Sequence, residues 1–293
     1  MGIALSLAGM LCFAANILFT RYAIARMPVE AGFLLVLSVN IAFPIALFAA
    51  ELGVRRTPFA WDWAAAGLFT LGGIVGTFLG RRLLFDTVRL LGPSRASVMH
   101  STAPAFALVF AWLLAGEQLG AYEIALMVVV WVGLWFTQPH STASSAQAGI
   151  RKGLLVGLVT VAGFGLGSVL RGLAMHRWDE AIVGTLLASI AAFACQLAAT
   201  RDWKAVGAQL RAARPATIWL YVACGISTSL GAIFMALAMN HIEIALAVLV
   251  VHTTPLLIFP VSVFILKNRE ELAPRTVMGA ALVLSGIVLL AIR

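Results

Sequence analysis

Ten long apolar segments, separated by short polar connections, set the pattern of this chain. They cover residues 2–20, 31–50, 62–82, 95–115, 120–138, 153–173, 181–199, 217–238, 244–266 and 273–292. About 20 helical residues cross a bilayer core roughly 30 Å thick, so each segment is long enough to span it. Backbone polar groups inside a membrane must be satisfied within the segment, which a helix does. The pattern therefore predicts an all-α integral membrane protein with ten transmembrane helices.

Two connections carry signals of their own. Residues 139–152 are small and polar, which is typical of a linker. The stretch "RDWKAVGAQLRAARP", residues 201–215, indicates a short amphipathic helix at the membrane interface. Tryptophan favours the headgroup level, and five tryptophans fall near segment ends: Trp61, Trp63, Trp178, Trp203 and Trp219.

Composition and charge agree with the apolar pattern. The chain is 62% hydrophobic and 11% charged, whereas a soluble domain carries about a quarter charged residues. The net charge of +8 comes from lysines and arginines scattered through short loops, without the continuous patch that nucleic acid requires. Cys12, Cys195 and Cys224 all lie in apolar segments, so no disulfide framework is expected.

The chain repeats itself at a distance of 150 to 153 residues. Matched pairs include Phe13 with Phe164, Arg26 with Arg177, Glu30 with Glu180, His100 with His252, and Glu117 with Glu270. This register predicts two five-helix repeats, 1–138 and 153–293, joined by the 139–152 linker. Because five is odd, the second repeat must enter the membrane from the opposite side. Inverted repeats are typical of secondary transporters, which bind substrate near the middle of the membrane between the repeats.

Small residues recur every fourth position in two matched segments. Gly72, Gly76 and Gly80 lie in the third segment, and the eighth has small residues at the equivalent positions: Ala223, Ser227 and Gly231. Such a face lets another backbone approach closely, so we interpret it as helix packing rather than a substrate site.

Both repeats place a histidine, hydroxyls and a proline at the same place in an apolar segment. The stretches are "HSTAP", residues 100–104, and "HTTP", residues 252–255. Pro104 and Pro255 lack an N–H, so the carbonyls of His100 and Val251 are expected to be left free and each helix to bend. Pro260 is a third predicted kink. Free carbonyls inside a membrane need protein, water or ligand beside them, so we predict that the two stretches line one polar cavity.

The predicted substrate-binding residues are polar groups of these stretches and of neighbouring segments: His100, Ser101, Thr102, His252, Thr253, Thr254, Asn16, Asn40, Arg21, Arg171 and Arg82. Alternatives stay open for several of them. The histidines also fit the headgroup level, and the asparagines also fit hydrogen bonds between helices. An arginine at a segment end can bind a carboxylate or phosphate or extend to the headgroups, and Arg82 can pair with Asp86 four residues on.

The stretch "STAPAFALVFAWLLAGEQLGAYEIALMVVVWVGLWF", residues 101–136, resembles the EamA-type branch of the drug/metabolite transporter superfamily. In the second copy Glu270 and Gly286 match, while "LKNRE" replaces the usual Gly-Glu step. The resemblance implies a ten-span fold in the plasma (inner) membrane. It also implies export or exchange of amino acids, sugars, nucleotide sugars and similar small metabolites.

The function expected from these features is secondary transport of a small zwitterionic or anionic metabolite by alternating access. Amino acids are the first expectation, and phosphorylated or nucleotide-linked sugars are the alternative. The first segment has no carboxylate, which argues against cation/proton antiport of the small multidrug kind. An intramembrane enzyme is a remote alternative, because no H-E-x-x-H or G-x-S-x-G motif occurs.

No cofactor or metal is expected from the sequence. Proton coupling through a histidine stays open, as do monomer and homodimer. The orientation of the termini has two alternatives. The loop charges favour both termini outside, by the positive-inside rule, whereas members of the family usually keep them in the cytoplasm.

Overall fold

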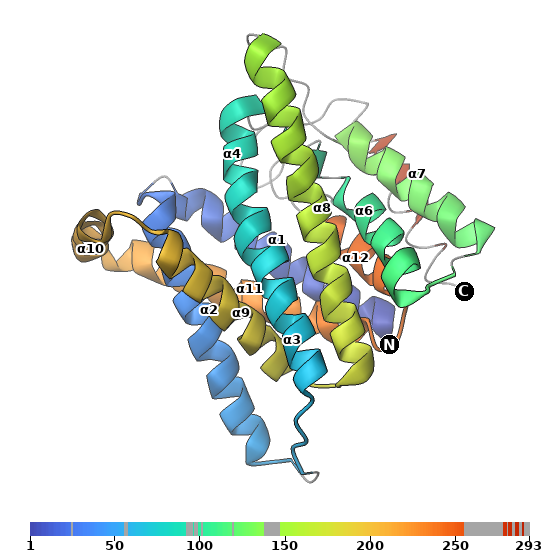
Figure 1. Ribbon diagram of the computed structural model, residues 1–293, viewed down its shortest axis with the longest axis horizontal. Helices are drawn as coiled ribbons and strands as arrows, with labels where there is room; N and C mark the ends of the chain where they lie inside the picture. The colour runs from blue at the N-terminus through green and yellow to red at the C-terminus, as the bar shows by residue number, and fades with distance from the viewer. Residues whose placement is uncertain are drawn as a thin grey trace.

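The computed structural model describes residues 1–24, 26–55, 58–91, 96, 99–100, 102–118, 120–137 and 147–254, with residues 278–279, 281–282, 285–286 and 289. These ranges form a bundle of helices without strands (Figure 1). The elements are α1 (Gly2–Ile24), α2 (Val29–Leu52), α3 (Trp63–Gly72), the π-helix η1 (Gly73–Gly80), α4 (Arg81–Leu91), α6 (Ala103–Phe110), the π-helix η2 (Ala111–Ala115), α7 (Ala121–Thr137), α8 (Gln147–Arg177), α9 (Ala181–Ala199), α10 (Trp203–Ala212), α11 (Pro215–Ala238) and α12 (Ile244–His252).

Among the described residues, six helical stretches are long and apolar enough to cross a membrane: Gly2–Ile24, Val29–Leu52, Trp63–Leu91, Arg151–Arg177, Ala181–Ala199 and Pro215–Ala238. Ala103–Ala115 and Ile124–Gly133 are shorter apolar helices. Most of the last predicted segment and much of the ninth lie outside the described residues, as do Ser101, Pro255 and Pro260.

The structure corrects the predicted end of the third segment and confirms a predicted short helix after residue 200. The third segment was expected to end at residue 82, but its helix continues through Arg81 and Arg82 to Leu91. Arginine is a good helix former, so a charged residue alone does not end a helix. The predicted short helix after residue 200 is confirmed as α10, whose first turn is capped by Asp202 accepting from the Ala205 N–H at 2.9 Å.

The glycines of the third segment hold α3, η1 and α8 close together, as the spacing predicted. A Cβ built on Gly76 would lie 3.3 Å from the Cα of Gly167 on α8, and one on Gly72 would lie 3.0 Å from the Gly167 carbonyl oxygen. Side chains at these positions would push the two helices apart. Figure 1 shows α3 and α4 running alongside α8.

Helices of one half pack mainly against helices of the other half, and the pairings are reciprocal. Helix α1 packs on α11, and its repeat counterpart α8 packs on α3, η1 and α4. Likewise α1 packs on α12 while α8 packs on α6, and α2 packs on α11 while α9 packs on α3 and η1. Helices α2 and α9, which match each other in the repeat, lie against one another.

The reciprocity extends to single residues. A Cβ on Gly231 of α11 would come within 3.0 Å of the Phe13 ring of α1, and one on Gly80 would come within 3.3 Å of the Phe164 ring of α8. Phe13 matches Phe164 in the repeat, and Gly231 matches Gly80. The core of the bundle is thus an interface between the two halves.

Candidate functional site: a buried cluster of basic side chains

The two repeat-related histidines meet where α12 ends and α6 begins. The ring centroids of His100 and His252 lie 5.7 Å apart. The edge of the His100 ring also contacts Phe164 of α8, with centroids 4.8 Å apart. His252 Nδ1 donates to the Val248 carbonyl at 2.8 Å, since a carbonyl only accepts. The Nε2 atom of His252 therefore remains the nitrogen that is free to bind another group.

The neighbouring threonines bond to their own backbone. Thr254 donates its hydroxyl to the Val251 carbonyl at 2.6 Å, and its backbone N–H approaches the same oxygen at 3.3 Å. The expectation that Pro255 leaves this carbonyl free was therefore wrong, because a hydroxyl three residues on replaces the missing donor. Thr253 likewise donates to the Val250 carbonyl at 2.6 Å and lies 3.0 Å from Met10 Sδ.

At Pro104, where the sequence predicted a bend, a helix begins. Helix α6 begins at Ala103, so Pro104 stands in its first turn, where a missing N–H is tolerated. Thr102 donates its hydroxyl to the Met99 carbonyl at 2.7 Å in the preceding turn. His100 is itself helical and lies in the turn that precedes α6.

Two arginines lie close to this histidine pair. Arg171 of α8 donates from Nη2 to Thr77 Oγ1 in η1, with the Gly72 carbonyl 3.5 Å away. Arg81 lies one helical turn beyond Thr77, and its guanidinium carbon is 5.2 Å from the centroid of the Phe33 ring. Arg81 is near enough to Arg171 and His100 to interact electrostatically with both. We call His100, His252, Arg81 and Arg171 the basic cluster.

The sequence interpretation selected Arg82 and missed Arg81. Adjacent residues on a helix point about 100° apart, so only one of the two can face Arg171. The structure places Arg82 in an exposed cleft with Glu30, and Asp86 pairs with Arg89 at 4.0 Å instead of with Arg82. The spacing from Thr77 to Arg81, four residues, was the signal that could have identified the cluster arginine.

Polar atoms in the basic cluster lack partners. His100 Nδ1 and Arg171 Nε are buried and have no hydrogen-bond partner among the described residues. Among the described residues, no carboxylate lies within 4.0 Å of Arg81 or Arg171. The ion pairs there join Arg55 to Glu51 and Glu180, Arg89 to Asp86, and Arg177 to Asp62. A buried polar group without a partner is unfavourable, so the arrangement is suited to a ligand that accepts hydrogen bonds and carries negative charge.

The remaining predicted site residues bond to groups outside the basic cluster or lie outside the described part of the chain. Asn40 is buried and contacts Ser229 Oγ of α11 at 3.3 Å, which is the helix-to-helix alternative. Asn16 accepts from Thr20 at 3.2 Å within α1. Arg21 belongs to α1, but its side chain lies outside the described residues, as does all of Ser101.

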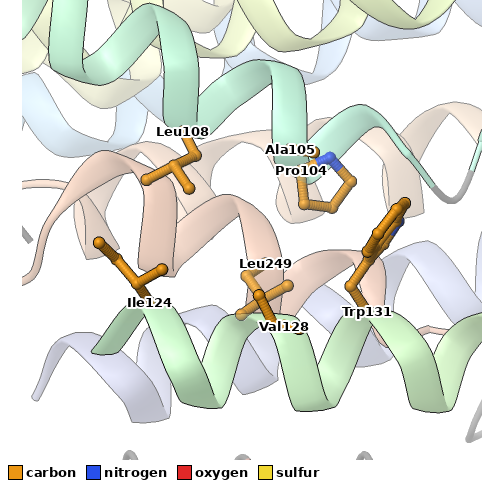
Figure 2. A pocket seen from close by; sticks show the side chains of 7 residues that line it. All are labelled: Pro104, Ala105, Leu108, Ile124, Val128, Trp131 and Leu249. Atoms are coloured by element: carbon orange, nitrogen blue, oxygen red, sulfur yellow. The ribbon is translucent and has the colours of Figure 1, made fainter. Parts of the chain in front are cut away.

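Other regions of the described structure offer fewer groups that could bind a metal ion or a polar ligand. Among the described residues no group of three or more His, Cys, Asp or Glu side chains could hold a metal ion. Figure 2 shows a pocket between α6, α7 and α12. Its lining is aliphatic and aromatic: Pro104, Ala105, Leu108, Ile124, Val128, Trp131 and Leu249. The basic cluster is the described region with the chemistry to bind a polar metabolite.

Comparisons with known proteins assign the chain to a family. The EamA-like transporter family matches residues 1–138 and 151–292. No curated protein is significantly similar in sequence. A protein of known crystal structure shares the fold, with a TM-score of 0.77 and 17% identity, covering 98% of this chain and 95% of that one. The chain therefore belongs to the EamA-like transporter family, a group of multi-pass membrane transporters within the drug/metabolite transporter superfamily.

Proposed function

We propose that the protein is a secondary transporter of the plasma (inner) membrane that exports or exchanges a small metabolite by alternating access. The metabolite binds through a carboxylate or phosphate group at the basic cluster. Amino acids are the first candidates from the sequence, and phosphorylated sugars are the alternative. Export from the cell agrees with the family, whose members are transporters.

One observation carries the proposal: two arginines and two histidines gather between the halves without a nearby carboxylate among the described residues. Arginine keeps its charge inside a protein and binds carboxylates and phosphates through two parallel hydrogen bonds. Ionisable groups within a membrane protein usually mark a substrate or ion pathway. A bound anion would give the unpartnered Arg171 Nε an acceptor.

The packing supports alternating access through ten helices in two inverted repeats. Reciprocal contacts such as Phe13 with Gly231 and Phe164 with Gly80 are those expected of halves related by a two-fold axis. An axis in the membrane plane would put the basic cluster, where the two halves meet, near mid-membrane. In transporters of this architecture one bundle rocks against the other around such a site.

Transport by purified protein in liposomes is the direct test. Competition against a labelled substrate pool should identify anionic metabolites, and the recovered substrate should be chemically unchanged. Recovery of an altered product would favour the intramembrane enzyme instead. If amino acids, phosphorylated sugars and organic acids all fail to move or compete in either direction, the proposal is wrong.

A further inference from the structure

We propose that the basic cluster selects ligands with two negative charges close together, as in a phosphomonoester or a short dicarboxylate. Amino acids with a single carboxylate are then poor substrates. This inference rests on the proposed function and narrows its substrate class. Both ligand types are compact dianions, and matched inhibitors can distinguish a phosphomonoester from a dicarboxylate.

The charge balance of the cluster is the first argument. Arg81 and Arg171 remain protonated at all relevant pH values, and both come from membrane-spanning helices. The acidic residues that form ion pairs in the described part are engaged with other arginines, at the ends of the helices. A dianion would neutralise both charges, whereas a monoanion would leave one. An unpaired buried charge is strongly unfavourable.

An amino acid fits this balance less well than a dianion does. Its carboxylate could bind one arginine, but its ammonium group would enter a region that already holds two guanidinium groups and two imidazoles. An ammonium needs a carboxylate or several free carbonyls around it. The Val250 and Val251 carbonyls beside His252 already accept from Thr253 and Thr254. The described residues of the cluster therefore offer an amino group little to bind.

The free hydrogen-bonding atoms point to where the two charges would bind. Arg171 is held to η1 through Nη2, which leaves Nε buried and unpartnered. The guanidinium carbon of Arg81 lies over the Phe33 ring, 5.2 Å from its centroid, and an arginine over an aromatic face can still donate from its N–H groups. His100 Nδ1 is a third unpartnered atom. A ligand with two anionic groups, or a phosphate with three oxygens, can bond to both arginines at once.

Thr77 acts as a positioning residue for Arg171. Its hydroxyl accepts the Nη2 bond, and it stands in η1, between Gly73 and Gly80. Arg171 would otherwise be free to adopt other rotamers of its long side chain, which carries considerable conformational entropy. Thr77→Val, which keeps the shape without the hydroxyl, should weaken dianion binding about threefold to tenfold while leaving the preference for dianions intact.

The test compares matched inhibitors on the protein in liposomes. The probes are inorganic phosphate, a phosphomonoester, a four-carbon dicarboxylate, the monoamide of that dicarboxylate, and a neutral amino acid. At pH 7.5 the phosphomonoester is almost fully doubly charged, since its second pKa is about 6. We expect at least one dianion class to inhibit about tenfold or more strongly than the monoamide and the amino acid. The dianion class that inhibits more strongly shows whether the ligand is a phosphomonoester or a dicarboxylate.

Variants assign the preference to the two arginines. Arg81→Gln and Arg171→Gln should each weaken inhibition by dianions about tenfold or more. Inhibition by the monoamide should weaken less, so the difference between dianions and the monoamide should shrink. Arg89→Gln, an exposed arginine on the same helix, is the matched control and should change neither. Arg→Lys variants keep the charge and guard against misfolding, and they should retain a weakened preference for dianions.

Two results would overturn the inference while leaving transport itself standing. One is equal inhibition by the amino acid and the dianions in the unmodified protein. The other is an unchanged dianion preference in properly folded Arg81→Gln and Arg171→Gln variants. Failure of every probe to inhibit or move would instead count against the proposed function.

Discussion

The two ends of the helix bundle contain repeat-related elements but differ in how their charges are paired. At the closed end, formed by residues 51–55, 58–62 and 176–180, Arg55 donates to Glu180 at 2.6 Å and to Glu51 at 2.8 Å. Arg177 also pairs with Asp62 at 2.7 Å. At the opposite end, which we call the cleft end, a polar cleft is lined by Glu30, Arg82, Ala199, Arg201 and Asp202.

The repeat makes this difference informative. Glu180 and Glu30 occupy matching positions at the start of α9 and α2, yet only Glu180 has a cationic partner within 4.0 Å in the described part of the chain. The side chains of Arg55 and Glu180 are each 13% exposed, so water screens this pair little. The charged residues around the cleft are mostly exposed.

Aromatic packing reinforces the closed end. Trp178, which directly follows α8, is buried and donates from Nε1 to the Ala60 carbonyl at 2.8 Å. Its ring contacts Phe59, Trp61 and Phe69. Residues 59–61, in the connection between α2 and α3, therefore pack over the tryptophan. Under the proposed alternating access, the closed end is sealed and the cleft end is the side from which substrate enters.

The largest expected effect comes from fixing the shape of the cleft. Cysteines placed at Glu30 and Arg201, in a background without native cysteines, should be linked by a cleavable bifunctional thiol reagent. Transport should then stop almost completely and return after cleavage, because the cleft must change shape in each cycle. The two single-cysteine variants are the controls. Unimpaired transport in the linked protein would contradict the comparison between the ends.

Reversing one charge at the closed end should have the next largest effect. Arg55→Glu and Glu180→Arg each put like charges opposite one another, so we expect each to slow transport about tenfold or more. The double variant restores an opposite pair and should recover most of the loss, although Glu51 limits the recovery. Arg89→Glu at the exposed pair with Asp86 is the control and should change the rate little. Full activity of both single variants would show that the pair does not hold this end closed.

The histidines between the two ends should have an effect of about tenfold. His100→Ala or His252→Ala should lower the transport rate about tenfold, corresponding to about 1.4 kcal/mol, while folded yield stays close to normal. Gln keeps hydrogen bonding but takes up no proton near neutral pH. Rescue of binding without pH-dependent transport would assign proton coupling to the histidine, and rescue of both would assign substrate binding. Unchanged rates in both Ala variants would remove the histidines from the site.

The smallest expected effect is a pH dependence of the closed end. The Ala65 N–H and the Arg177 guanidinium hold the pKa of Asp62 below its ordinary value. A lowered pKa stabilises the folded protein above the unfolded pKa of about 3.9, and this stability is lost as pH falls through the folded value. We expect Asp62→Asn to lower the melting temperature by a few degrees at pH 7 and to reduce the further loss seen below about pH 4. Equal melting curves for the two proteins at pH 7 and pH 3 would contradict this.

Sequence by itself determined the apolar helices, the repeat and the family. These follow from local chemistry: a bilayer demands runs of apolar residues, and repeated glycines predicted the close packing of α3 and η1 on α8. The match of His100 with His252 also singled out two residues that do lie together, because related positions in a two-fold arrangement can meet near the axis. Ser101, Pro255 and Pro260 remain predictions, since they lie outside the described residues.

Only the tertiary structure decided which arginine faces inward and which carbonyls stay free. Arg81 and Arg82 are adjacent arginines that the sequence does not distinguish. Arg81 turns toward Arg171 and Phe33 and Arg82 turns to the cleft, because neighbouring helical residues point in different directions. Thr254 satisfies the Val251 carbonyl through a rotamer that no pattern specifies. The pairing of Arg55 with Glu180, 125 residues apart, likewise depends on how the two halves pack. Side-chain direction and long-range contact are properties of the packed bundle, and a list of residues does not contain them.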